Sequence, residues 1–323
     1  MKQNAFGPLG TVSALTLGGG GIGLLWGPSS REEAIGTLHA AIDGGIDLLD
    51  TAPMYGHCES IIGEAFNGKL PAQVRITTKC GLGSPEPEQV APRLEASLAA
   101  SLLAMKLSSV DVFFLHSNIC ADDYVYANRP DLQERTATRW SLYVEQVIPA
   151  MEALRASGRI GAWGITGVGV PASIEQALRA PRRPAYVQAL TNLLDSAGGM
   201  RRFVEGAQPR NIIATANASG VAVMGIRAVQ AGALTAQIDR PLSANNPDAL
   251  DYTRAAPFRA WCAQQGEDPA VIAHRYALSM PGVATVVLGV KNRAELQQCL
   301  DAQARGPLAA SIIAQIDALG LRA

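Results

Sequence analysis

LGGGGIG, residues 17–23, decides between two ways of folding this chain. Its glycines at 18, 20 and 23 match the spacing GxGxxG, which holds a dinucleotide pyrophosphate in doubly wound open sheets. That motif needs its last glycine to open a helix at once, so that the helix N-terminus meets the phosphate. Here LLWGPSS intervenes, and the first helical pattern begins only at Ser30. The context disfavours a phosphate cradle. Two other interpretations of the glycine run stay open: it is a turn that ends the first strand, or it exposes backbone that a flat ligand approaches closely.

Short apolar runs alternate with longer stretches of helical period along the whole chain. The expected strands are 13–17, 47–50, 74–79, 110–116, 160–166, 186–190, 221–226 and 285–290. The expected helices are 30–43, 58–68, 86–106, 143–157, 171–180, 200–219, two within 255–280, 292–303 and 307–318. The strands are nearly all apolar, as when both faces of a parallel sheet are buried. We therefore expect one closed (β/α)₈ TIM barrel over residues 1–323 as a single domain, with a doubly wound open sheet as the rival.

The clearest helix start lies just after the glycine run. Ser30 and Glu33 have the spacing of a capping box, and Gly44 and Gly45 end the periodic stretch. Asp43 falls inside this helix, so no acidic residue stands where a ribose-binding carboxylate would end a second strand.

The composition is that of an ordinary globular protein, with 48% hydrophobic residues, 17% charged residues and a net charge of −1. Without a basic field, nucleic acid and anionic membranes are not expected partners. The apolar runs are far shorter than the roughly 18 residues of a membrane span. The first residues, MKQNAFGPLG, lack the apolar stretch of a signal peptide. We expect a cytoplasmic protein.

The five cysteines form no CxxC pair and their number is odd, which argues against a disulfide framework and a structural zinc site. Cys58, Cys80 and Cys120 are interpreted as small buried hydrophobic residues rather than as a redox or metal trio. No metal is expected.

Polar residues of distinct chemistry occupy consecutive strand ends. Asp50, Lys79 and His116 each end an expected strand, and Tyr55 lies in the loop after Asp50. In a barrel of this type, functional groups gather at the carboxyl ends of the strands. The four types together predict a proton-transfer site.

The chemistry of this set rests on the tyrosine. A tyrosine hydroxyl has a pKa near 10. A lysine ammonium about 4 Å away stabilises the phenolate by roughly 4 kcal/mol at an effective dielectric of about 20. We therefore expect Lys79 to lower the pKa of Tyr55, and desolvation to oppose part of this shift. Asp50 would hold Lys79, and His116 would orient a carbonyl oxygen.

The segments DTAPMYGHCESIIGEAF, RITTKCG and VDVFFLH resemble the signature segments of the aldo-keto reductases, and the similarity spans essentially the whole chain. The resemblance implies a TIM barrel that uses a nicotinamide cofactor, usually NADPH, to interconvert small-molecule carbonyls, including sugars, and alcohols. It implies that Tyr55 is the general acid/base and that Lys79, Asp50 and His116 complete a tetrad.

The resemblance also implies cofactor-binding positions near the nicotinamide. Gln188 matches the glutamine that holds the carboxamide, and Thr166 matches the small polar residue that ends the fifth strand. The family often has Asn next, where this chain has Gly167, so Asn192 is a candidate substitute. Gly18 and Gly19 match rim backbone beside the nicotinamide ribose.

Two further segments match the rest of the cofactor site. GIRAVQAGALT (225–235) has Ile226 and Arg227 where the family often has a stacking tyrosine. LGVKNRAEL (288–296) resembles the segment at the adenosine phosphate end. Its candidate residues are Gly289, Lys291, Arg293 and Glu295. The two cations suit a 2′-phosphate and the carboxylate suits a ribose hydroxyl, so the sequence favours NADP and leaves NAD open.

Candidate substrate contacts lie in two loops. Trp26 follows the first strand, and Tyr124 and Trp140 belong to the irregular segment 117–143. Arg129, Arg135 and Arg139 in that segment are candidates to meet an anionic substrate, with a solvated loop as the alternative.

Two other functions stay open at this point. The barrel could be a non-catalytic nicotinamide-binding regulatory protein that senses redox state for a partner. It could also be a lyase or isomerase that uses Lys79 as a Schiff base.

Overall fold

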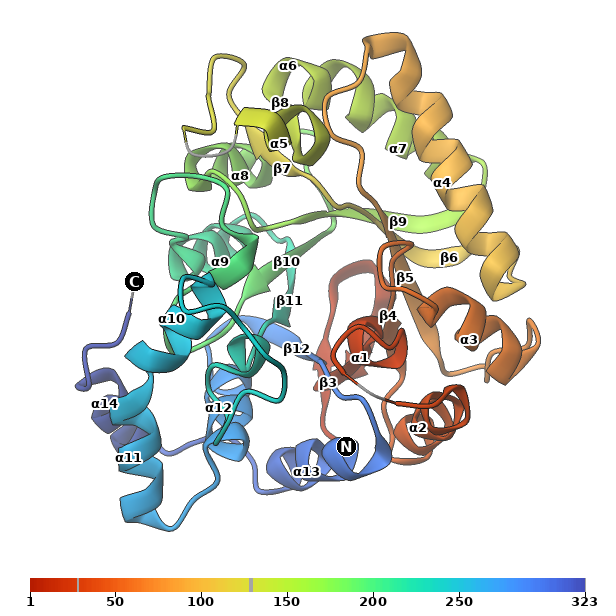
Figure 1. The fold of residues 1–323 in the computed structure, drawn as a ribbon. Helices are drawn as coiled ribbons and strands as arrows, with labels where there is room; N and C mark the ends of the chain where they lie inside the picture. Colours follow the sequence, from red (N-terminus) through yellow and green to blue (C-terminus); the bar gives the residue numbers. More distant parts are fainter. Residues whose placement is uncertain (28, 128–129, 323) are drawn as a thin grey trace.

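Eight parallel strands close into a barrel with helices outside it, in a computed structural model that describes residues 1–27, 29–127 and 130–322 (Figure 1). The strands are β3 (Leu15–Gly18), β4 (Leu48–Asp50), β5 (Arg75–Cys80), β6 (Val110–Leu115), β9 (Ile160–Thr166), β10 (Tyr186–Leu190), β11 (Ala222–Ile226) and β12 (Val283–Leu288). Neighbours pair in the order β3-β4-β5-β6-β9-β10-β11-β12, and β12 pairs with β3 to close the ring. The predicted TIM barrel is confirmed, and the open sheet is excluded.

The helices include those that the sequence predicts after the barrel strands, in the expected order, together with further helices that it does not predict. They are α1 (Gly19–Ile22), α2 (Arg31–Asp43), α3 (Cys58–Phe66), α4 (Val90–Met105), α5 (Pro130–Thr136), α6 (Trp140–Leu142), α7 (Ile148–Ala156), α8 (Pro171–Arg179), α9 (Pro209–Ala218), α10 (Pro247–Arg254), α11 (Ala256–Gln265), α12 (Pro269–Leu278), α13 (Arg293–Ala304) and α14 (Ala310–Asp317). Within the described ranges, none of the helices has the length and apolar character needed to cross a membrane.

One of the two hydrogen bonds of the predicted capping box at the start of α2 is present. The Ser30 hydroxyl accepts a hydrogen bond from the Glu33 backbone N–H at 3.0 Å, and the helix ends at Gly44. The Glu33 carboxylate does not turn back to Ser30. It accepts hydrogen bonds from the backbone and the guanidinium of Arg293, and so joins α2 to α13.

After β10, one helix begins later than predicted and one helix was not predicted. The helix expected over 200–219 begins only at Pro209, whose fixed φ and missing N–H suit the first turn of α9. The preceding residues form a loop with a short 3₁₀ turn at Gly198–Met200. Helix α10 was not predicted; its Asn246 cap accepts a hydrogen bond from the Asp248 backbone N–H.

Two small sheets lie outside the barrel. β1 (Gln3–Ala5) and β2 (Thr11–Ser13) form an antiparallel hairpin whose Phe6 packs on Tyr186, with ring centroids 4.6 Å apart. Phe6 belongs to a buried cluster with side chains from several barrel strands, so the hairpin plugs the end of the barrel at which those strands begin. In segment 117–143, β7 (Asn118–Cys120) pairs in parallel with β8 (Ala137–Arg139).

The glycine run ends β3 and turns directly into α1, a one-turn helix that the sequence did not predict. A Cβ on Gly21 would lie 1.9 Å from the Val290 carbonyl oxygen, and a Cβ on Gly23 would lie 1.8 Å from the Tyr55 carbonyl oxygen. The run is therefore glycine because it packs backbone to backbone against the segments that follow β12 and β4.

Replacing Gly21 with Ala is expected to lower the free energy of unfolding by about 1–3 kcal/mol, because backbone must move to make room for the methyl group. Gly81→Ala is the matched control, since its Cβ would lie 3.9 Å from the His116 carbonyl oxygen, an ordinary van der Waals contact. Urea unfolding of both variants measures the difference. Equal midpoints for the two would contradict this account of the glycine run.

Candidate active site

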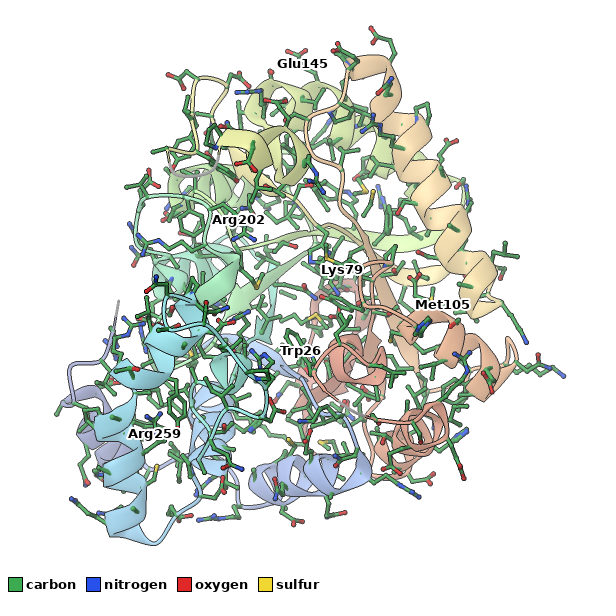
Figure 2. The ribbon with its side chains drawn as sticks, in the orientation of Figure 1. Trp26, Lys79, Met105, Glu145, Arg202 and Arg259 are labelled. Carbon is green, nitrogen blue, oxygen red and sulfur yellow. The ribbon has the colours of Figure 1, made fainter. Side chains whose placement is uncertain are left out.

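The four predicted rim residues converge at the carboxyl end of the barrel. Asp50 ends β4, Lys79 lies near the end of β5, and His116 directly follows β6. In Figure 2, Lys79 and Trp26 lie near the centre of the ring of strands, whereas Met105, Glu145 and Arg259 lie among the outer elements. The barrel thus brings together residues that are distant in sequence.

Lys79 and Asp50 form a buried ion pair. The Lys79 ammonium donates to Asp50 Oδ2 at 2.7 Å and to the Thr51 carbonyl oxygen at 2.8 Å. The other carboxylate oxygen of Asp50 accepts from the Thr77 hydroxyl at 2.6 Å and from the Gln188 amide at 2.8 Å. Every charge in this pair is hydrogen-bonded, which is the condition for burying it.

Tyr55 and His116 lie on the groove side of this pair. The Lys79 ammonium is 4.6 Å from the centroid of the Tyr55 ring. The rings of Tyr55 and His116 meet edge to face, with centroids 5.9 Å apart. Both side chains are half-buried and line the same groove.

The electrostatics of Tyr55 differ in part from the expectation. Burial raises the pKa of Tyr55 above its usual value, and the opposing effect of the Lys79 charge does not overcome it, since Asp50 also raises it. Burial works to lower the pKa of Lys79, but Asp50 and Tyr55 together outweigh burial, and the pKa of Lys79 is raised. Tyr55 therefore holds its proton at neutral pH and Lys79 stays charged.

His116 is neutral in this environment. Burial, assisted by the charge of Lys79, lowers the pKa of His116 to about 3. Its ring therefore has one N–H donor and one acceptor nitrogen at ordinary pH.

A groove of about 760 Å³ starts at these residues and runs between the loops after β3 and β11 toward α12 and α13. Its lining includes the backbone of Gly18–Gly20 at the rim and His274, Gln298 and Cys299 at the far end. Such an elongated groove, with acid–base groups at one end, suits a long ligand that reaches the site from the side.

The sequence model of the Aldo/keto reductase family matches residues 14–320 of this chain. The chain belongs to the aldo/keto reductase family. Members of this family are oxidoreductases that act on carbonyl and alcohol groups and use nicotinamide cofactors, and this defines the chain as such an oxidoreductase.

Two curated relatives match along most of their length. L-galactose dehydrogenase of Arabidopsis thaliana is 23% identical over 291 residues, which cover 89% of this chain and 83% of the relative. D-threo-aldose 1-dehydrogenase of a Pseudomonas species is 27% identical over 319 residues, covering 89% and 88%. The holo structure of an aldo-keto reductase from Bacillus halodurans superposes with a TM-score of 0.73 at 21% identity, over 99% of this chain and 96% of that one.

Most of the cofactor residues inferred from the aldo/keto reductase resemblance line the groove. They are Gly18, Gly19, Thr166, Gln188, Ile226, Arg227, Gly289, Lys291 and Glu295. Arg293 is absent from the described lining. Its guanidinium pairs with Glu33 at 2.7 Å on the outer surface.

Of the residues expected to bind the nicotinamide carboxamide, only some have polar groups free to form hydrogen bonds. The Thr166 hydroxyl is buried and has no hydrogen-bond partner among the described residues. At Gly167, a Cβ would lie 2.7 Å from the Gln188 carbonyl oxygen, so a larger residue would require the backbone to shift. The Asn192 amide N–H groups already donate to the Ser196 carbonyl oxygen and to the Gln230 side chain in the loop after β11, so both of its donors are occupied.

Lys291 is held between two carboxylates. It pairs with Asp239 from the loop after β11 and with Glu295 from α13, the latter at 3.0 Å. The neighbouring Arg240 lies over the Trp26 ring, 5.4 Å from its centroid. These contacts join the loops on the two sides of the groove. Sequence reasoning missed Asp239 and Arg240 because their loop has no periodic pattern.

A histidine and a cysteine line the far end of the groove. They are His274 and Cys299. His274 Nδ1 bonds the Ala270 carbonyl oxygen at 2.8 Å, and its Nε2 lies 3.6 Å from Cys299 Sγ. Burial raises the pKa of Cys299 to about 12, so this thiol stays protonated.

Of the three residues predicted to contact the substrate, one lines the groove and two lie elsewhere. Trp26 lines the groove. The Tyr124 hydroxyl instead donates to Glu205 at 2.7 Å, and Trp140 packs on Tyr143 with centroids 5.7 Å apart. Neither belongs to the described lining of the groove, so the structure gives them roles in holding the loops.

The arginines of segment 117–143 do not form a described anion site. Arg139 pairs with Glu134 at 2.6 Å. Arg135 lies exposed near the end of α5. Arg129 lies outside the described residues. Across the described ranges, no cluster of three or more His, Cys, Asp or Glu residues is arranged to hold a metal ion.

The depressed pKa of His116 predicts a pH dependence of stability. The unfolded chain, with a histidine pKa near 6.5, binds this proton before the folded chain does. The free energy of unfolding should therefore fall as the pH decreases from about 6.5 toward about 3. In His116→Asn the free energy of unfolding should decrease less over this pH range. His274, whose pKa is also lowered by burial, contributes equally to both proteins and does not affect the comparison. Urea unfolding at pH 7 and pH 4.5 measures this; parallel decreases would contradict the assignment.

Proposed function

We propose that this protein transfers hydride between a nicotinamide cofactor and a small carbonyl or alcohol, with Tyr55 as the general acid and base. The observation that carries the proposal is the buried Lys79 ammonium, fixed by Asp50 and lying against the ring of a tyrosine that faces a long groove. The match of residues 14–320 to the family supports it.

Each side chain has a distinct task in reduction. Tyr55 keeps its proton until the substrate oxygen gains negative charge, and then donates it. The phenolate that results is stabilised by the nearby Lys79 charge. Asp50 keeps Lys79 protonated and in place. Neutral His116 donates its N–H to the carbonyl oxygen and orients it. In oxidation the proton moves in the reverse direction.

The residues of the groove fit a dinucleotide. Thr166 has a buried hydroxyl with no described partner, and no hydrogen bond is described to the carbonyl oxygen of the Gln188 amide. These two groups would hold the carboxamide, and Gly18, Gly19, Ile226, Arg227 and Gly289 would line the path toward α13. The bound cofactor supplies the hydride.

The contacts at the far end favour NAD over the NADP that the sequence suggested. Lys291 faces two carboxylates, and Arg293 is neutralised by Glu33 outside the groove. A 2′-phosphate brings two further negative charges to this region, whereas a ribose hydroxyl can donate a hydrogen bond to Glu295. We therefore propose NAD as the better bound cofactor.

The alternative functions receive less support. A Schiff-base lysine must be neutral to attack a carbonyl. Lys79 is instead charged and donates to Asp50 and Thr51. A regulatory barrel without catalysis would bind cofactor yet turn over no carbonyl, and it leaves the Tyr55–Lys79 geometry without a purpose.

Tyr55→Phe should abolish turnover, with a loss of at least about 10²–10⁴-fold in kcat, because the proton donor is removed. The ring that lines the groove is kept, so cofactor affinity should stay within about twofold of the parent protein. Steady-state kinetics and cofactor titration measure the two quantities. Retained turnover would refute the role of Tyr55.

NADH should bind more tightly than NADPH, by about tenfold or more, corresponding to about 1.4 kcal/mol. Glu295→Gln should narrow this difference, mainly by strengthening NADPH binding, because one carboxylate of the site is neutralised. Glu267→Gln, whose parent carboxylate pairs with Arg305, is the matched control. Quenching of tryptophan fluorescence gives both affinities, since Trp26 lines the groove. Tighter binding of NADPH by the parent protein would exclude the NAD proposal.

A further inference from the structure

Among the described donors to the Asp50 carboxylate, Thr77 alone has no task in the proposed function. Asp50 Oδ2 accepts from Lys79, and Oδ1 accepts from the Gln188 amide at 2.8 Å and from the Thr77 hydroxyl at 2.6 Å. An ionised carboxylate only accepts hydrogen bonds, so the hydroxyl of Thr77 is the donor in this bond. The proton of Thr77 is therefore directed at the carboxylate that holds Lys79.

The geometry of the strands brings Thr77 to this position. In the pairing of β4 with β5, Thr77 lies directly opposite Asp50. Thr77 and Lys79 are two residues apart on β5, so both point into the barrel and reach the same carboxylate. The intervening Thr78 points to the opposite face, where its hydroxyl donates to Glu59 of α3 at 2.6 Å. Two adjacent threonines thus have separate partners, and Thr77 is the one that acts on the ion pair.

Thr77 is buried away from the groove. It is 0% exposed, and it is absent from the described lining of the groove. A hydrogen bond to a charged acceptor is stronger than one between neutral groups, and burial protects it from competition by water. An effect of Thr77 on the reaction must pass through Asp50, so Thr77 can position other groups but does not touch the reacting atoms.

Two opposite charges act on the phenol of Tyr55. The charge of Lys79 works to lower the pKa of Tyr55, and the charge of Asp50 works to raise it. The Cys58 thiol stays protonated because burial raises its pKa to about 12, and His116 is neutral because burial lowers its pKa to about 3. The stability of the Tyr55 phenolate therefore depends on how strongly Asp50 acts beside Lys79.

The Thr77 hydroxyl changes this balance in favour of the phenolate. Its hydrogen places partial positive charge against Asp50 Oδ1, and so offsets part of the negative charge that opposes ionisation of Tyr55. It also restrains rotation of the carboxylate, which keeps Oδ2 at 2.7 Å from the Lys79 ammonium. Both effects act when Tyr55 gives up its proton and negative charge develops on its oxygen.

On this basis we infer that Thr77 is a positioning residue for proton transfer: its hydroxyl fixes and partly neutralises the Asp50 carboxylate, and so stabilises the Tyr55 phenolate in the transition state. The inference rests on the proposed function. It adds to the site a buried side chain that contacts neither the groove nor the reacting oxygen.

Thr77→Val keeps the shape of the side chain and removes the donor, while Gln188 still bonds Asp50 Oδ1. The rate of hydride transfer to para-nitrobenzaldehyde, whose nitro group activates the carbonyl, should fall about 3–10-fold, because part of the stabilisation of the phenolate is lost. Single-turnover oxidation of bound NADH measures this rate. Its solvent deuterium isotope effect should increase, since proton transfer limits the step more. Cofactor Kd and substrate KM should stay within about twofold of the parent values, because Thr77 lies outside the groove lining.

Matched variants separate the hydroxyl from the packing of the side chain. Thr77→Ser keeps a hydroxyl and should retain the parent rate, whereas Thr77→Ala, which differs from it by that hydroxyl alone, should lose rate as Thr77→Val does. Thr285→Val is the control, because Thr285 is 1% exposed on β12 and its hydroxyl pairs with that of Thr16 at 2.7 Å. It should change neither the rate nor the isotope effect. Urea unfolding of each variant distinguishes a loss of stability from a loss of rate.

Equal rates in Thr77→Ser and Thr77→Ala, or an unchanged solvent isotope effect in Thr77→Val, would overturn the role of Thr77 and leave the proposed function standing. A loss of rate in Thr285→Val as large as that in Thr77→Val would overturn it as well. Cofactor binding by the parent protein without turnover of para-nitrobenzaldehyde or glyceraldehyde would refute the proposed function itself, and this inference with it.

Discussion

The buried ion pair between Lys79 and Asp50 is the interaction on which the rest of the site depends. It joins β4 to β5 directly and reaches β10 through Gln188. Removing either partner would leave a buried charge without compensation, which costs about 3–5 kcal/mol. The pair therefore stabilises the barrel at the same point at which it keeps Lys79 charged beside Tyr55. In the proposed function, stability and proton transfer share one set of contacts.

The groove is built from loops that are tied across the barrel mouth. The loop after β11 has Arg227, Gln230 and Ala231 in left-handed backbone conformation, which non-glycine residues seldom adopt. Hydrogen bonds of Arg227 and Gln230 to Asp248 and Asp251 of α10 hold it there. Local strain of this kind persists only where surrounding contacts over-determine it, and it is concentrated at functional sites. The loop owes its shape to α10, which the sequence pattern did not reveal.

Sequence reasoning succeeded where the barrel imposes a rule. Apolar strands followed by periodic helices predicted the closed sheet, and polar residues at or near successive strand ends predicted that Asp50, Tyr55, Lys79 and His116 lie together. It was incomplete where contacts between distant segments decide the structure. Asn192 is bonded to Gln230 in the loop after β11, Tyr124 is bonded to Glu205, and the segment before Pro209 is not helical. None of these outcomes follows from periodicity or local propensity.

The sequence by itself determined the alternation of strands and helices, the family, and which four polar residues meet at the carboxyl end of the barrel, because each of these follows from local pattern and spacing. The tertiary structure alone decided which charges are free. Lys291 and Arg293 are two cations in the sequence, but Asp239, Glu295 and Glu33 reach them from separate elements and neutralise them. Likewise, burial outweighs the Lys79 charge in setting the pKa of Tyr55. Electrostatics depends on distance and solvent access through space, and a linear sequence specifies neither.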